Sequence, residues 1–160
     1  MINTTNSSTI SVAGSIMSLS NTLAEAVLST SSDAIVAADK EGTIIFWNPG
    51  AERIFGYAKG FAIGKSLDII IPERLRKSHW AGYHQVIETG ESRYGHGDIL
   101  AVPGVKEDGS SVSIEFTIVP LRADTGELTG LAAIMRDVTQ RFEEMRALKR
   151  KLAEAMKATG

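Results

Sequence analysis

Three histidines carry the most specific chemical signal in this chain of 160 residues. His79 and His84 lie in a segment whose pattern predicts a long helix, and His96 lies in a Gly-His-Gly loop that the pattern does not place. At about 100° per residue, His79 falls on the inward, apolar side of that helix, one turn before Tyr83, and His84 falls nearly opposite. An inward histidine beside an apolar cavity suits axial ligation of haem iron. The alternative is a buried neutral histidine bonded to a backbone carbonyl or to water.

The other reactive residue types do not indicate an enzyme. The acidic residues Glu73, Glu88, Glu91 and Asp98 are scattered along expected surfaces, and no phosphate-binding loop, H-x-x-x-H pair or nucleophile elbow occurs. The sequence contains no cysteine, which excludes disulfides, cysteine-ligated metals and thiol nucleophiles. We therefore predict no catalytic residues and no metal other than haem iron bound through His79.

The first half of the chain predicts a hairpin followed by a short helix. Ala34 to Ala38 and Thr43 to Trp47 are two runs of β-forming residues, separated by a turn in which Gly42 is free to take a positive φ. Asn48 suits the N-cap of a helix, and Pro49 suits its first position.

The second half predicts one long helix and three strands. The helix runs from Pro72 to Glu88 and ends at Gly90, and the strands are Asp98 to Val105, Ser110 to Pro120 and Leu128 to Val138. Together with the hairpin they predict an α+β fold in which a five-stranded antiparallel sheet carries its helices on one face.

Both ends of the chain extend beyond this unit. Residues 1–15 are rich in Ser, Thr and Asn and are expected to be disordered, and residues 16–31 are expected to form an amphipathic cap helix centred on Ser18 to Ser29. The central domain is expected to span residues 32–139. Residues 140–160 are expected to form a charged exit helix with an apolar stripe, which suits a short coiled coil.

Four motifs, in this order, resemble those of the PAS domain family. They are N-P-x-A-E-x-x-F-G-Y from Asn48, I-G-K-S from Ile63, K-E-D-G-S from Lys106 and R-D-V-T from Arg136, and the resemblance covers roughly Ala24 to Arg141. It implies the PAS fold and a cavity between the inner face of the sheet and the long helix. The residues expected around that cavity are His79, Trp47 (or Ile45), Phe55, Leu75, Tyr83, Val86, Ile99, Ile114, Phe116, Ile118 and Met135. The same residues would also make an ordinary packed core.

The segment around His79 is similar to haem-binding PAS oxygen sensors such as the rhizobial one, which implies haem b as a candidate cofactor. That group places its histidine three residues before the tyrosine, whereas His79 is four residues before Tyr83 and Trp80 stands at the matching position. Without cysteine, the flavin adduct of the LOV branch is excluded. The family's D-I-T motif implies a hydrogen bond of Asp137 at the junction between the last strand and the exit helix, where Thr139 suits an N-cap.

The resemblance implies a sensory module that binds a small ligand or cofactor and signals through its terminal helices. The alternative is a constitutive interaction and dimerisation module that binds no ligand. The unpaired apolar stripes predict a homodimer, and a histidine kinase or other signalling protein is the expected partner. A net charge of −2 gives no reason to expect nucleic acid or membrane binding. We see no signal peptide and no apolar run of about 20 residues, so we expect a cytoplasmic protein.

Overall fold

The computed structural model describes residues 7–91 and 100–158 and has an α+β architecture. Its elements follow in the order α1 (Ser7–Leu28), β1 (Ala34–Asp39), β2 (Ile44–Trp47), α2 (Pro49–Phe55), α3 (Lys59–Ala62), the 3₁₀ helix η1 (Leu67–Ile69), α4 (Glu73–Thr89), β3 (Leu100–Val105), β4 (Ser111–Arg122), β5 (Leu128–Asp137) and α5 (Thr139–Ala158). The expected fold class is confirmed. Within the central domain, the observed boundaries of the predicted elements differ from the predicted ones by only a few residues.

The five strands form one antiparallel sheet in the order β2-β1-β5-β4-β3. The first and last strands of the domain are therefore neighbours at its centre, where Ala34 pairs with Met135. Pro103 lies on β3, which is an edge strand, and so its missing N–H interrupts no central ladder.

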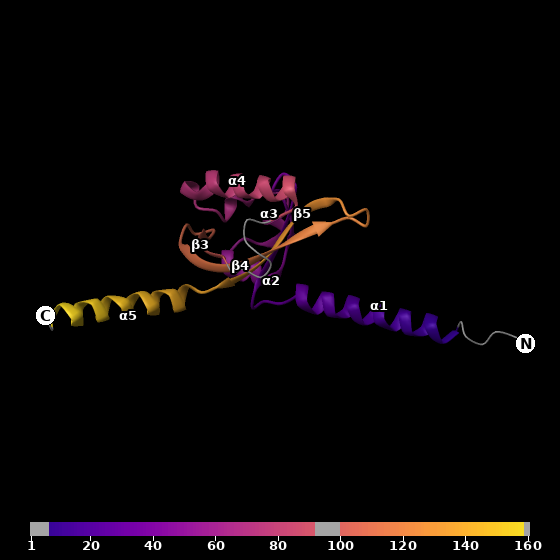
Figure 1. Ribbon diagram of the computed structural model, residues 1–160, viewed down its shortest axis with the longest axis horizontal. Coiled ribbons are helices and arrows are strands. Elements are labelled where there is room, and N and C mark those ends of the chain that lie inside the picture. Colours follow the sequence, from indigo (N-terminus) through magenta and orange to yellow (C-terminus); the bar gives the residue numbers. More distant parts are fainter. Residues whose placement is uncertain (1–6, 92–99, 159–160) are drawn as a thin grey trace, which may run out of the picture.

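The helices between β2 and β3 cover one face of the sheet, and Figure 1 shows α4 lying across it. Alternation along β4 explains which side chains face the helices, because successive residues of a strand point to opposite faces. Val112 and Ile114 are buried, whereas Ser111 is exposed. The predicted inward set of β4 is thus on the helix-covered face.

Asn48 joins three segments of the domain from a fully buried position. Its side-chain oxygen accepts hydrogen bonds from the backbone N–H of Ala51, which caps α2, and from that of Ile35 in β1, at 2.9 and 2.7 Å. Its amide nitrogen donates to the carbonyls of Thr30 and Asp33, at 2.9 and 3.0 Å. The predicted cap is confirmed, and its two donated bonds also hold the segment between α1 and β1.

The terminal helices leave the domain on opposite sides (Figure 1). The N-terminal segment differs from the expectation, because α1 begins at Ser7 whereas residues 1–15 were expected to be disordered; residues 1–6 lie outside the described part. The helical spacing of apolar residues continues upstream through Met17, Ala13 and Ile10. The expectation of disorder gave more weight to the high Ser and Thr content than to this spacing.

Large apolar side chains remain exposed along both helices. They are Ile16, Met17, Leu19, Leu23, Val27 and Leu28 on α1, and Phe142, Met145, Leu148, Leu152 and Met156 on α5. In the part of the chain that the structure describes, no helix is both long enough and apolar enough to cross a bilayer.

Replacing Asn48 with alanine should lower the free energy of unfolding by about 3 kcal/mol, because buried backbone groups lose their partners. Urea denaturation monitored by circular dichroism measures the loss. Asn21→Ala, at an exposed position of α1, is the matched control and should change stability by less than about 0.5 kcal/mol. Equal stability of the two variants would contradict the role of Asn48.

Candidate functional site

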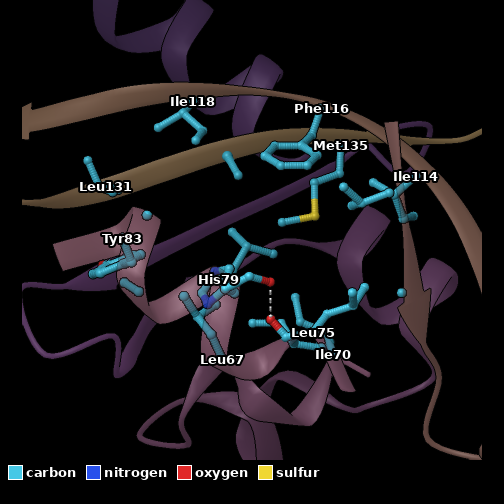
Figure 2. A pocket seen from close by; sticks show the side chains of 18 of the residues that line it. Leu67, Ile70, Leu75, His79, Tyr83, Ile114, Phe116, Ile118, Leu131 and Met135 are labelled. Carbon is cyan, nitrogen blue, oxygen red and sulfur yellow. Dashed lines mark hydrogen bonds between the residues drawn. The ribbon is translucent and has the colours of Figure 1, made fainter. Parts of the chain in front are cut away.

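A cavity of about 780 Å³ lies between α4 and the inner face of the sheet. Figure 2 shows Leu75, His79 and Tyr83 on the helical side, opposite Phe116, Ile118 and Met135 of the strands. Its volume falls within the range of roughly 300–1,000 Å³ that is usual for small-molecule sites. The central strands and α4 thus enclose a space that side chains leave unfilled.

The structure brings most of the expected lining residues together. Phe55, Leu75, His79, Tyr83, Val86, Ile114, Phe116, Ile118 and Met135 all line the cavity. Ile99 lies outside the described residues, and Ile45 is half exposed on the edge strand β2.

Trp47 was expected at the cavity but does not line it. Its indole packs against the Phe55 ring, with 5.6 Å between centroids, and its Nε1 donates a hydrogen bond to the carbonyl of Tyr57. Because β2 is the edge strand on the far side of β1, an inward residue there meets α2 and the segment after it. Trp47 therefore packs against Phe55, which lines the cavity, without lining the cavity itself.

Several lining residues were not predicted. Leu131 and Ala133 of β5 line the cavity, and the i, i+2 spacing that connects them with Met135 would have identified them. Leu67 and Ile70 come from η1 and the residue after it. These two residues reach the cavity because of where η1 lies relative to α4. An element of three residues is too short for its periodicity to predict that position.

Most polar groups of the lining already have protein partners. The Ser78 hydroxyl donates to the Leu75 carbonyl within α4 (dashed line in Figure 2). The Tyr83 hydroxyl donates to the backbone carbonyl of Asp39, which ties α4 to the end of β1. Burial raises the pKa of the Tyr83 phenol, and the carboxylates of Asp39 and Glu41 add to the effect. Tyr83 therefore stays protonated.

His79 is the exception among these polar groups. Its Nδ1 is buried and has no hydrogen-bond partner, the one such side-chain nitrogen or oxygen among the described residues. Burial lowers the pKa of His79; nearby Asp68 opposes the shift and His84 adds to it. The imidazole is therefore neutral near pH 7. His84 is exposed and lies off the cavity lining, as predicted.

Trp80, which stands at the position where the haem-binding sensors have histidine, is absent from the lining. Its Nε1 donates to the Asp68 carboxylate at 2.9 Å, and its ring lies against Gly42 so closely that a Cβ there would be 2.2 Å from a ring carbon. Gly42 has φ +83, as its turn requires. These contacts set the rotation of α4 so that His79, one residue earlier, faces the cavity.

The described residues do not fit a haem bound through His79. A metal-ligating histidine almost always donates its second ring N–H to a carboxylate, a carbonyl or water, and Nδ1 of His79 has no acceptor among the protein groups. In the described part of the chain no Lys or Arg lines the cavity to pair with the haem carboxylates. Nor does the described part contain a cluster of three or more His, Asp or Glu side chains that could hold a metal ion.

The junction between β5 and α5 is held by a compact set of hydrogen bonds. Asp137 Oδ1 accepts from the backbone N–H and the hydroxyl of Thr139, at 2.9 and 2.6 Å. The Thr139 hydroxyl oxygen accepts from the backbone N–H of Ser113 in β4, at 2.9 Å, and Val138 N–H donates to the Ser113 carbonyl. Thr139 is the first residue of α5 and is not the expected N-cap. Its oxygen connects the helix to β4 instead of capping it.

A family model described as the PAS fold matches residues 28–143. Among curated proteins, the oxygen sensor protein DosP of Escherichia coli is 30% identical over 65% of this chain and 13% of its own length. The signal transduction histidine-protein kinase AtoS of the same species is 26% identical over 79% of this chain and 20% of its own length. The chain thus spans a fifth or less of these relatives.

Among solved structures, the PAS domain of a protein from Colwellia psychrerythraea superimposes with a TM-score of 0.65 at 27% identity. The match covers 76% of this chain and 98% of that domain.

The lowered pKa of His79 predicts a loss of stability on acidification. The pKa of His79 is near 6.5 in the unfolded chain and lower in the folded protein. At a pH between these two pKa values, the unfolded state binds a proton that the folded state does not bind. The contribution to stability is complete above pH 6.5 and is lost progressively as the pH falls toward the folded pKa.

Urea denaturation across this window measures the effect. His79→Phe should flatten the dependence of unfolding free energy on pH, whereas the exposed-site control His84→Phe should retain it. The same slope in wild type and His79→Phe would show that burial of His79 does not shift its titration.

Proposed function

This chain belongs to the PAS family, and we propose that it senses a small ligand bound in the cavity under α4 and passes the binding event to α5. It is a sensory domain of the kind found in signalling histidine kinases. The observation that carries the proposal is that the cavity and the α5 junction share two paired strands. Ile114 lines the cavity and its Cα partner across the ladder is Asp137, while Phe116 is paired with Met135.

The shared strands give a short path for a mechanical signal. A ligand that displaces Ile114 or Met135 changes the relation of β4 to β5 within one or two residue pairs of Ser113 and Asp137. These two residues hold the first turn of α5 through Thr139. A ligand shifts the equilibrium only if it binds one arrangement of this junction more tightly than the other.

The exposed stripes of α1 and α5 support dimerisation as the output. Each helix protrudes from the domain (Figure 1), and the large apolar side chains named above are exposed along it. Pairing them with the same helices of a second copy buries both stripes around a two-fold axis, the commonest symmetry of protein oligomers. A histidine kinase, in the same chain or as a separate protein, is the proposed partner, by analogy with the relatives.

The alternative, a constitutive dimerisation module, rests on the same exposed stripes. It differs in requiring no ligand, and a cavity of about 780 Å³ in place of a filled core supports the sensor.

Filling the cavity should abolish ligand retention. Ala133 lines the cavity on β5, and Ala133→Phe should remove the small-molecule adduct that native mass spectrometry is expected to show for the wild-type protein. Ile134→Phe, on the opposite and partly exposed face of β5, is the matched control and should keep the adduct. Releasing the adduct should change amide exchange at residues 139–143 of the wild type. A wild-type protein without adduct, or with unchanged exchange, would favour the constitutive module.

The proposed dimer is tested by analytical ultracentrifugation at micromolar concentration. The full chain should sediment at about twice its monomer mass, 17.2 kDa, and deletion of residues 141–160 should shift it toward monomer with the domain still folded. Leu148→Gln together with Leu152→Gln should weaken the dimer, and the charged-face control Lys149→Gln with Lys151→Gln should not. A full-length monomer at high concentration would refute this assembly.

A further inference from the structure

The charge of the lining restricts the ligand. In the described part of the chain the cavity wall contains no Asp, Glu, Lys or Arg, and most of it is aliphatic or aromatic. A charged ligand there would lose hydration without gaining an ionic partner from these lining residues, which costs several kcal/mol. The lining therefore favours a neutral molecule that is mostly apolar.

The polar groups of the wall restrict the ligand further. Ser78 and Tyr83 use their hydroxyl protons on backbone carbonyls, and Gln85 is exposed. His79 is the remaining polar side chain of the described wall, and no other described residue hydrogen-bonds its ring. A polar atom of the ligand thus has one obvious partner.

The two nitrogens of His79 differ in their surroundings. Nδ1 is enclosed and has no partner, whereas Nε2 is not among the enclosed, unpartnered atoms. Because the ring lines the cavity, Nε2 is the nitrogen left to face a ligand. A neutral imidazole carries its proton on one of its two nitrogens, and the other nitrogen is an acceptor. In proteins, a buried N–H donor without an acceptor is rarer than a buried acceptor without a donor. The tautomer with hydrogen on Nε2 avoids that orphaned donor.

From this geometry we propose that the cavity takes a neutral, predominantly apolar organic ligand whose hydrogen-bond acceptor, such as a ketone, ester or ether oxygen, binds the Nε2–H of His79. The proposal rests on the ligand-sensing function proposed above and names the class of ligand. It also assigns His79 a metal-free role, since ligation of iron through Nε2 needs the other tautomer.

Equilibrium dialysis with three matched probes tests the ligand class. Methyl naphthyl ketone has the acceptor, isopropenylnaphthalene replaces the carbonyl oxygen with CH₂, and naphthoate carries a charge. Wild-type protein should bind the ketone roughly fivefold more tightly than the hydrocarbon, as one added hydrogen bond provides, and naphthoate most weakly. His79→Phe should bind ketone and hydrocarbon equally, whereas His84→Phe should keep the preference.

Each result bears on a different claim. Equal binding of ketone and hydrocarbon by the wild type, or a preference that survives His79→Phe, overturns the role of His79 but leaves a ligand-binding cavity. Failure of every probe to bind overturns this inference, whereas the proposed sensing function stands or falls separately with the retained adduct and the amide exchange of residues 139–143. Tightest binding of naphthoate overturns the assignment of a neutral ligand.

The tautomer itself is measured on the unaltered protein, so the test does not depend on the folding of a variant. Long-range nitrogen–proton correlation spectra of isotope-labelled wild type should show the His79 proton on Nε2. A proton on Nδ1 overturns the inference. So does a haem-loaded protein whose Soret band is lost in His79→Ala and kept in His84→Ala.

Discussion

The attachment of α4 to the β1–β2 turn is the constraint on which the cavity depends. Tyr83 donates to the Asp39 carbonyl, and the Trp80 ring packs on Gly42 while its indole N–H bonds to Asp68. Trp80 and Tyr83 lie near the middle of α4 (Glu73–Thr89), and their contacts hold the helix beside the hairpin. Side chains from α4 and from the sheet line the space between them without filling it.

The same attachment decides which residue of the helix faces the ligand. Because the Trp80 ring packs against the β1–β2 turn, the side chain of its neighbour His79 faces the cavity. The imidazole of His79 stays neutral there. Under the proposed ligand class, this apolar wall with one neutral donor would discriminate ligands by shape and by a single hydrogen bond. The one-residue displacement relative to haem-binding sensors is thus accompanied by a different environment for the histidine, with an enclosed Nδ1 that lacks an acceptor.

The sheet connects this wall to the exit helix without an intermediate element. β5 contributes Met135 to the cavity and Asp137 to the junction, and β4 contributes Ile114 and Ser113 to the same two places. The side chain of Ile114 faces the cavity, while the backbone N–H and carbonyl of its neighbour Ser113 bond to Thr139 and Val138. In the proposed mechanism, the pairing of the two strands transmits a small displacement at the cavity to the junction.

The sequence by itself determined the features that depend on local periodicity and local backbone chemistry. The hairpin, the Asn48-Pro49 helix start, the alternation of β4 and the inward position of His79 all follow from spacing within one segment. Tertiary structure alone decided which distant segments meet. Trp47 lies behind Phe55 because β2 is an edge strand, Leu67 reaches the cavity because η1 folds beneath α4, and Thr139 bonds to Ser113, 26 residues earlier, in place of capping its own helix. The surroundings of each nitrogen of His79 likewise depend on the packing of α4 against the turn, and no pattern along the helix encodes that contact.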